Sequence, residues 1–184
     1  QYTSGFPVDM SLTRNPTSGG TWEGWHMGAR LLQGNYQLSY SDAAWATGGN
    51  FQYDYNDGIF IGGWSGYMSW MWKRGQGFDV VTYKGNGASR VINHSLGRAP
   101  EMMWLKIRNA GHEWIVWHKG LNGGTNSYEK SLYLSHDNAE FTTSPNALNN
   151  TLPTSNHFSL SSWAKVNSSG DTFVAMLFAS VDGI

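Results

Sequence analysis

Cysteine is absent from this chain of 184 residues, and charge is scarce. Without cysteine there is no disulfide framework, no thiolate zinc site and no cysteine nucleophile. Charged residues make up 14% of the chain and the formal net charge is −1, so nothing favours nucleic acid or an anionic membrane as a partner. No apolar run approaches the roughly 20 residues that span a bilayer. The first ten residues, QYTSGFPVDM, lack a starting methionine and the pattern of an intact signal peptide. We therefore expect a processed chain or a part of a longer one.

Aromatic residues and glycine are abundant, with ten Trp, nine Tyr, eight Phe and 23 Gly. Aromatic side chains favour half-buried pleated surfaces, and glycine favours tight turns. Short alternating segments joined by turns are typical of antiparallel sheets. We therefore predict an all-β fold, an antiparallel β-sandwich of jelly-roll type.

A short motif, Trp-x-x-Trp-His, occurs twice with the same spacing. It comprises Trp22, Trp25 and His26, and again Trp114, Trp117 and His118, 92 positions later (114 − 22). Three further blocks recur in the same order along the chain, which predicts two tandem related copies. We place the first copy at residues 1–75, truncated at its start, and the second at residues 76–184. We interpret the recurring Trp and His residues as structural: a return strand that locks a hairpin onto the opposite sheet.

Strands are clearest in the second copy. Residues 102–108 alternate, so Met103, Leu105 and Ile107 share one face while Trp104, Lys106 and Arg108 share the other. Residues 113–118 are expected to return antiparallel, with Ile115 and Trp117 on one face and Trp114, Val116 and His118 on the other. The segment 171–180 is apolar on both faces, which predicts a central strand. Further strands are expected at 79–83 and 90–93, around a Gly-Asn-Gly turn, at 130–135, and in the first copy at 9–14, 22–26, 36–40, 51–55 and 67–73.

Several blocks of the second copy resemble a repeat module of tail-fibre and tail-associated proteins of marine tailed phages. They are GFDVVTYKGNG, INHSLGRAPEMMWLKIRN, WIVWHKG and PTSNHFSLSSWAKVNSSGDTFVAMLFASVDGI. The resemblance implies a virion component with a virion or extracellular location, a role at the host surface and no catalytic residues. It also implies a homo-oligomer, commonly a trimer, or contact with neighbouring repeats of a longer chain. The first copy departs from the pattern at Ser11 and Thr13, where the module has apolar and lysine residues.

The polar residues give weak signals for chemistry. His26 and His118 lack recurring ligand partners, so we expect no metal and no cofactor, and a strand-end histidine that hydrogen-bonds to a turn instead. The acidic segment YDYNDG at 53–58 lacks the ligands of a calcium loop, which favours a hairpin turn. Acids for glycoside hydrolysis are available but form no recognised strand pattern. They include Glu23, Asp54, Glu101, Glu113 and Glu140.

Tryptophan offers a surface for sugar stacking because the apolar face of a pyranose fits an indole ring. Most tryptophans are expected in strands, where they fill the sandwich. Trp45, Trp64 and Trp163 fall in predicted loops beside small residues and are the candidate glycan-binding residues.

Together these observations predict a non-enzymatic structural and adhesive module of a phage tail fibre or appendage that binds host-surface glycans. A glycan-degrading tail enzyme of sandwich fold is one alternative. A capsid-decorating or filament-forming structural subunit is the other.

Overall fold

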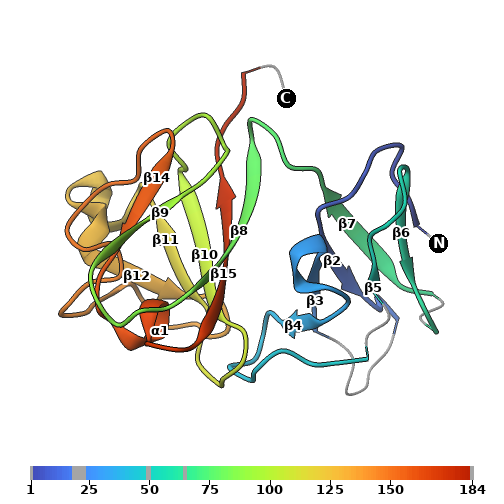
Figure 1. Ribbon diagram of the computed structural model, residues 1–184, viewed down its shortest axis with the longest axis horizontal. Coiled ribbons are helices and arrows are strands. Elements are labelled where there is room, and N and C mark those ends of the chain that lie inside the picture. The colour runs from blue at the N-terminus through green and yellow to red at the C-terminus, as the bar shows by residue number, and fades with distance from the viewer. Residues whose placement is uncertain (1, 18–23, 49–50, 64–65, 183–184) are drawn as a thin grey trace.

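The computed structural model describes residues 2–17, 24–48, 51–63 and 66–182 (Figure 1). Strands account for 37% and helices for 8% of it, which confirms the predicted all-β class. The strand pairs are antiparallel and form four sheets within these ranges. No helix in the described part of the chain is long and apolar enough to cross a membrane; α1 (Ala164–Asn167) has four residues.

The first half of the molecule, residues 2–72, contains a four-stranded and a three-stranded sheet. The larger sheet has the order β4-β3-β2-β7, and the smaller has the order β1-β6-β5. The strands are β1 (Tyr2–Thr3), β2 (Met10–Arg14), β3 (His26–Ala29), β4 (Tyr36–Leu38), β5 (Phe51–Gln52), β6 (Gly58–Ile61) and β7 (Met68–Trp72), with a 3-10 helix η1 (Arg30–Leu32) between β3 and β4.

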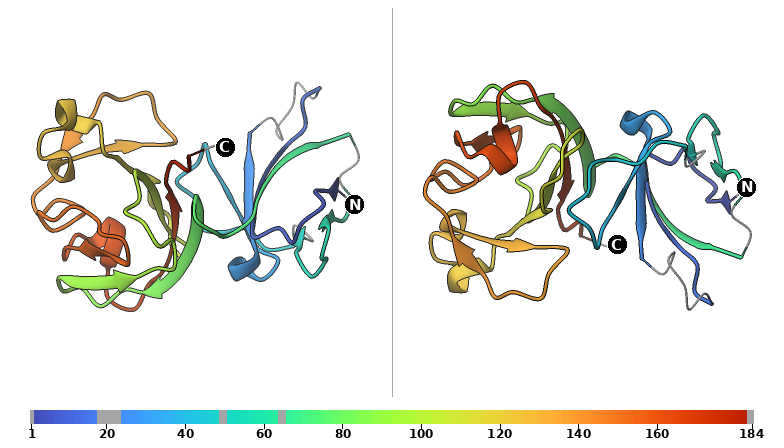
Figure 2. Two further views of the ribbon diagram at one scale, coloured as in Figure 1. Left: turned by 90° about the horizontal axis from the view of Figure 1, so that it is seen from above. Right: turned by 90° about the horizontal axis from the view of Figure 1, so that it is seen from below.

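The second half, residues 78–182, contains a six-stranded sheet of order β13-β12-β11-β10-β15-β8 and a ribbon of β9 and β14. The strands are β8 (Phe78–Lys84), β9 (Arg90–Asn93), β10 (Met102–Ile107), β11 (Ile115–His118), β12 (Lys130–Tyr133), β13 (Phe141–Thr142), β14 (His157–Leu160) and β15 (Thr172–Phe178). Two 3-10 helices, η2 (Leu121–Gly124) and η3 (Ser127–Glu129), precede β12. Figures 1 and 2 show the two halves side by side, joined by the connector 73–77.

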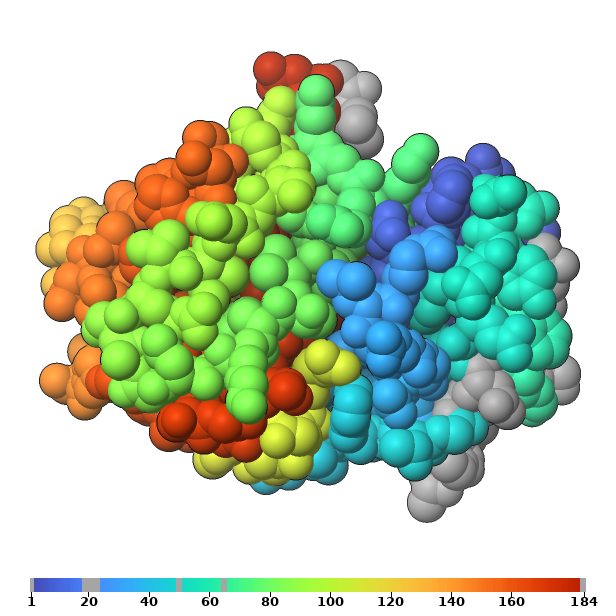
Figure 3. Space-filling view, viewed as in Figure 1, coloured from blue at the N-terminus to red at the C-terminus, as the bar shows by residue number. Residues whose placement is uncertain are grey.

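Three buried cores show that the sheets are stacked in a sandwich-like manner. One core joins the three-stranded and four-stranded sheets and includes Val8, Tyr36 and Ile59. A second joins the four-stranded and six-stranded sheets. The third lies between the six-stranded sheet and the β9–β14 ribbon. Both central sheets are therefore covered on both faces, and the halves share a core. The space-filling view shows the two halves in contact at the surface (Figure 3).

The predicted alternation of β10 and β11 is confirmed. Met103 and Leu105 pack in the core beneath β9 and β14, together with Ile115 and Trp117 of β11. Trp104 and Trp114 face the opposite way, into the core shared with the first half. The prediction that residues 171–180 form a central strand is also confirmed, since β15 lies between β10 and β8.

Several strand predictions need correction. The bounds predicted for the strand 22–26 are wrong, because β3 begins at His26, the residue at which the predicted strand ends. Strands form near 79–83 and 90–93, but β8 pairs with β15 and β9 pairs with β14, so the two are not partners across the intervening turn. The strands β1, β6, β13 and β14 were not predicted.

The serine and threonine of β2 face the core between the two sheets of the first half. The Ser11 and Tyr53 hydroxyls lie 2.7 Å apart, and the Thr13 hydroxyl lies 2.9 Å from that of Ser69. Burial raises the pKa of Tyr53 well above its usual range, while the hydrogen bond with Ser11 acts in the opposite direction. Polar residues are tolerated on this face because each finds a hydrogen-bond partner there.

Hydrogen bonds also cross from one half to the other. The Lys106 ammonium of β10 is buried and donates to the carbonyls of Asp42 and Ala43 in the first half at 3.2 and 2.9 Å, as well as to Ile107. Gln37 Nε2 donates to the Ile107 carbonyl at 2.9 Å. Trp114 Nε1 donates to the Leu38 carbonyl at 2.9 Å. These bonds fix the relative position of the two central sheets.

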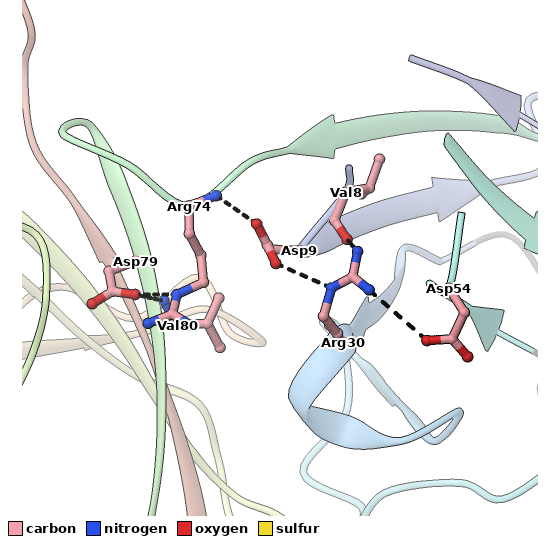
Figure 4. Close-up of polar contacts among 7 residues, drawn as sticks. All are labelled: Val8, Asp9, Arg30, Asp54, Arg74, Asp79 and Val80. Carbon is pink, nitrogen blue, oxygen red and sulfur yellow. Dashed lines mark hydrogen bonds and ion pairs between the residues drawn. The ribbon is translucent and has the colours of Figure 1, made fainter. Parts of the chain in front are cut away.

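A series of charged groups runs from the first half through the connector (Figure 4). Arg30 Nε lies 3.2 Å from Asp9, whose other carboxylate oxygen accepts the Arg74 backbone N–H at 2.8 Å. Arg74 Nε then pairs with the buried Asp79 of β8 at 2.6 Å. Arg74 of the connector is thereby bound to both halves, to Asp9 through its backbone and to Asp79 through its side chain.

Candidate functional site

A hollow of about 280 Å³ opens between the four-stranded and six-stranded sheets. We call it the aromatic slot. Its lining comprises Leu12, Trp25, Ser39, Tyr40 and Trp70 from the first half and Trp104, Leu134 and Ser135 from the second. Four of these eight residues are aromatic and none is charged, so the slot is an apolar site with a few hydroxyl groups.

Neighbouring strand ends place the rings of the first half. Trp25 directly precedes β3, and both the backbone N–H and the hydroxyl of Ser39, after β4, donate to its carbonyl at 3.0 and 3.3 Å. Trp70 projects from β7, with its ring centroid 4.4 Å from that of Trp25 and an interplanar angle of 30°. Two indole rings from non-adjacent strands thus form one continuous wall.

The rim and the interior of the slot differ in exposure. Trp70 and Tyr40 are 51% and 46% exposed and form the rim. Trp25 and Trp104 are half-buried against the core that the halves share. Gly24 makes room for the Tyr40 ring, because a β-carbon at position 24 would overlap it. The sequence Gly24-Trp25 therefore positions two of the aromatic residues.

One residue of the lining carries a buried hydroxyl. Ser135 Oγ is buried and has no hydrogen-bond partner among the described residues. A buried polar group without a partner is unfavourable, and most such groups in proteins are satisfied.

The described residues that line the slot carry no acid–base group. General acid–base catalysis needs a titratable side chain within hydrogen-bond reach of the reacting atoms. The lining contains no carboxylate, histidine or lysine. An uncharged ligand with an apolar face and peripheral hydroxyl groups fits this lining best.

The structure does not bring the predicted glycan-binding tryptophans together. The Trp45 ring is half-buried under the Arg108 guanidinium, which lies 4.5 Å from its centroid, so it serves the contact between the halves. Trp163, the residue directly before α1, packs on the core of the second half. Its ring centroid lies 6.5 Å from that of Phe141. Trp64 lies outside the described residues.

The residues predicted to be structural have different roles. Trp114 and Trp117 are 0% and 2% exposed and fill two different cores. Trp25 belongs both to a core and to the slot, whereas Trp22 lies outside the described residues. His118 ends β11, and its Nδ1 accepts the Gly120 N–H at 3.0 Å, as predicted for a strand-end histidine. His26 instead begins β3 and is buried, which lowers its pKa.

The two histidines occupy opposite ends of their strand pairs. His26 lies opposite Thr13 near the end of β2, whereas His118 lies opposite Met102 at the start of β10. The residue opposite Met10, at the start of β2, is Ala29. The two Trp-x-x-Trp-His motifs therefore differ in register by three residues, contrary to the expectation that they take the same place.

A larger hollow of about 870 Å³ lies where the connector meets the ends of β10 and β15. Its floor includes Trp72, Phe78 and Phe178, and Glu101 lies at its edge. The Glu101 carboxylate accepts hydrogen bonds from Lys119 and Ser180, both at 2.6 Å, and these contacts lower its pKa. The acid that borders this hollow is thus already engaged within the protein.

The other acids considered for hydrolysis are separated along the molecule. Asp54 lies 3.9 Å from Arg30, Glu113 pairs with Lys165 at 2.7 Å, and Glu140 accepts the Asn122 N–H at 2.9 Å; Glu23 lies outside the described residues. No three His, Cys, Asp or Glu side chains gather into a metal-binding group in the described ranges. The YDYNDG segment connects β5 and β6, which pair as the predicted hairpin.

Sequence reasoning missed the aromatic slot because its walls come from six separate segments. It assigned Trp70 and Trp104 to the filling of the sandwich, which is wrong for the exposed Trp70. The sequence of β7, MSWMW, did carry a signal, because it has large apolar residues on both faces of the strand. In the structure Met68 and Trp70 share one face and are exposed.

Comparison with known proteins gives one match. A family model described as "Domain of unknown function (DUF7483)" matches residues 64–184, about two thirds of the chain. It covers β7, the connector and the whole second half. No curated protein and no solved structure matches the chain.

Proposed function

The chain belongs to the DUF7483 family, a domain of unknown function, and we propose that it is a non-enzymatic adhesive module that binds a neutral sugar. We place the module in a virion appendage such as a phage tail fibre, at the host surface. The resemblance of the second half to tail-fibre repeats supports that location. The aromatic slot supports the binding role, and it is the observation that carries the proposal.

The composition of the slot favours an uncharged sugar. A pyranose ring presents an apolar face that packs on indole rings, and its hydroxyl groups pair with protein hydroxyls. Trp25 and Trp70 supply the stacking wall, and Ser39 and the exposed Tyr40 supply hydroxyl groups in the lining. Uronic and sialic acids would bury a carboxylate without a cation in the lining, which costs free energy.

The size of the slot favours a single ring. Sites for drug-sized ligands have volumes of roughly 300–1,000 Å³, and the slot, at about 280 Å³, lies just below that range. We therefore expect recognition of one terminal or exposed sugar residue. Strong attachment would then come from many modules acting together, since linked weak sites gain avidity.

A glycan array with neutral and acidic sugars, followed by calorimetric titration of the best neutral sugar, tests the proposal. Trp70→Ala should weaken binding by about tenfold, because an aromatic contact contributes about 0.5–1.5 kcal/mol beyond its buried area. Trp70 is half-exposed, so the variant should fold. Tyr55→Ala, an exposed aromatic residue outside the slot, is the matched control and should leave binding unchanged.

Other outcomes would redirect or remove the proposal. Loss of binding in Trp45→Ala or Trp163→Ala, with Trp70→Ala unaffected, would move the site to the predicted loop tryptophans. Binding to no sugar would refute the adhesive role. Release of new reducing ends from a bound glycan would show the hydrolytic alternative to be correct.

We also propose that the halves are related copies with a common jelly-roll-like plan. The order β4-β3-β2-β7 parallels β12-β11-β10-β15, and all these pairs are antiparallel. Met10 lies opposite Trp72 just as Met102 lies opposite Phe178. His26 and His118 take different positions along their strands, which counts against an equivalence of β3 and β11 residue by residue. The proposed relation of the halves is therefore supported by the order of the strands.

A further inference from the structure

The strand β7 forms an open edge of the four-stranded sheet. It pairs with β2 on one side and with no strand of the described chain on the other. Its sequence, MSWMW, contains no charged residue and no proline. Met68 and Trp70 are 38% and 51% exposed. Charged residues and proline on an edge strand hinder pairing with another strand, so an apolar edge strand that lacks both is prone to such pairing.

The long strand β8, at the edge of the six-stranded sheet, is protected. The Arg90 guanidinium donates to the Lys84 carbonyl at 2.7 Å, and the Gly75 N–H donates to the Phe78 carbonyl at 2.8 Å. The buried Asp79 carboxylate accepts the Ser95 N–H at 2.7 Å. Charged side chains and covering loops of this kind block pairing along an edge.

The remaining edges are short, covered or polar. β4 exchanges two backbone hydrogen bonds with Ala46. The strands β1, β5 and β13 have two residues each, and the ribbon of β9 and β14 has polar positions at Arg90, Asn93 and His157. The edge of β7 therefore differs from the others in the described part of the molecule.

The six-stranded sheet shows what would fit beside β7. In the matching strand order, β15 takes the place of β7, and β15 pairs with β10 on one side and β8 on the other. Trp70 of β7 lies opposite Leu12 of β2, and in the second half Met176 of β15 lies opposite Trp104 of β10. On its other side Met176 lies beside Val80 of β8. Met176 is 0% exposed, whereas Trp70 is 51% exposed.

We propose that the outer edge of β7 is an acceptor for a β8-type strand supplied by a neighbouring module of the same kind. The donor is an extended segment with the pattern Gly-Phe-x-Val-Val-x-Tyr, paired antiparallel to β7. Main-chain hydrogen bonds hold it, and its side chains lie beside Met68 and Trp70. In the second half Val80 and Thr82 of β8 lie beside Met176 and Val174 of β15 in the same way. The inference rests on the proposed relation between the halves and not on sugar binding.

A peptide with the sequence of residues 76–86, QGFDVVTYKGN, tests the acceptor edge. It is added to the full chain at concentrations at which both are monomeric by light scattering. We expect saturable one-to-one binding and slower amide hydrogen exchange confined to residues 68–72. The same peptide with Val81→Pro is the control, since proline cannot donate a backbone hydrogen bond, and its binding should be lost.

A variant of the chain tests the same edge from the other side. Met68→Lys places a charge on β7 and should abolish peptide binding while leaving the thermal unfolding unchanged. Met68 does not line the aromatic slot, so sugar binding should survive in this variant. Trp70 belongs to both surfaces and Met68 only to the edge, so this variant distinguishes a failure of peptide binding from a failure of sugar binding.

Three results would overturn the inference. The first is an absence of peptide binding to the wild-type chain. The second is protection from exchange elsewhere, for example at β4 or β13. The third is a dimer of the chain without peptide in which residues 68–72 are protected, because a second copy would then be the occupant of the edge.

Discussion

The second half of the molecule encloses its main sheet, whereas the first half leaves one edge of its main sheet open. In the second half β15 is paired on both sides and its central residues Phe173 to Leu177 are buried. In the first half β7 is paired on one side, and its residues are exposed or half-buried. Similar strand orders therefore give different degrees of completion, and the exposed aromatic residue of the incomplete edge lines the aromatic slot.

The two halves nevertheless share the core between their main sheets, so we expect them to fold as one cooperative unit. Residues of β2 and β3 pack directly against residues of β8 and β15. Neither sheet could keep its apolar face from water alone. The comparison therefore predicts that the halves unfold together. Trp114→Ala tests this, and the substitutions that follow sharpen the comparison from the largest expected effect to the smallest.

Trp114→Ala should have the largest effect. Trp114 is 0% exposed, packs in the shared core and donates a hydrogen bond to the Leu38 carbonyl of the other half. Removal of a buried tryptophan costs about 3–5 kcal/mol. Chemical denaturation should show one transition at lower denaturant, monitored by the fluorescence of the remaining tryptophans. Two separate transitions in the wild-type chain would show that the halves are independent.

Met176→Ala and Met68→Ala compare the closed and the open strand with the same residue type. Met176 in β15 is 0% exposed, so its truncation should cost about 2–5 kcal/mol. Met68 in β7 is 38% exposed, and its truncation should change the free energy of unfolding by no more than about 0.5 kcal/mol. Equal losses in the two variants, measured by urea denaturation, would show that the β7 edge is buried in solution.

Tyr53→Phe examines the polar interior of the first half. The Tyr53 hydroxyl pairs with that of Ser11 between the two sheets, a contact without a counterpart in β10, where Met103 holds an apolar place. Its loss leaves a buried hydroxyl without this partner and should cost about 1–3 kcal/mol. In the double variant with Ser11→Ala the loss should be smaller than the sum of the single losses. Additive losses would mean that the hydroxyls do not interact.

The centre of the second half, β10, β11 and β15, was predictable from sequence because these strands follow a simple pattern, whereas the pairing of β8 and β9 and the strand β14 were not. The alternation of Met103 and Leu105 with Trp104 and Lys106 assigned both faces of β10 correctly, and a run apolar on both faces identified β15 as central. Local pattern is sufficient where each strand packs against its neighbours in the same sheet.

The first half and the aromatic slot were harder to predict because their contacts are distant in sequence. The aromatic rings around 22–26 suggested a strand, but Trp25 turns toward Trp70 and the strand begins after it. Trp45 resembled an exposed loop residue, yet Arg108 of the other half covers it. Tertiary contacts of this kind override local pattern, and no spacing within one segment reveals them.

The buried Lys106 makes the contact between the halves depend on pH. Burial lowers the pKa of its ammonium to about 8 from the ordinary 10.5, although the charges of Asp42 and Glu113 act in the opposite direction. Between these two values the unfolded chain holds more protons than the folded chain, so the free energy of unfolding should rise with pH. The contribution is at most about 1.4 kcal/mol per pH unit.

Urea denaturation of the wild-type chain and of Lys106→Met from pH 7.5 to 9.5 isolates this contribution. The difference in unfolding free energy, wild type minus variant, should grow with pH, since methionine cannot titrate. The range stops below pH 10 because burial raises the pKa of Tyr53 and Tyr83, and their phenols oppose the trend once the unfolded chain ionises. A constant difference would mean that Lys106 keeps an ordinary pKa. Its carbonyl partners in the first half would then move aside to admit water, and the two halves would be less tightly joined than their shared core suggests.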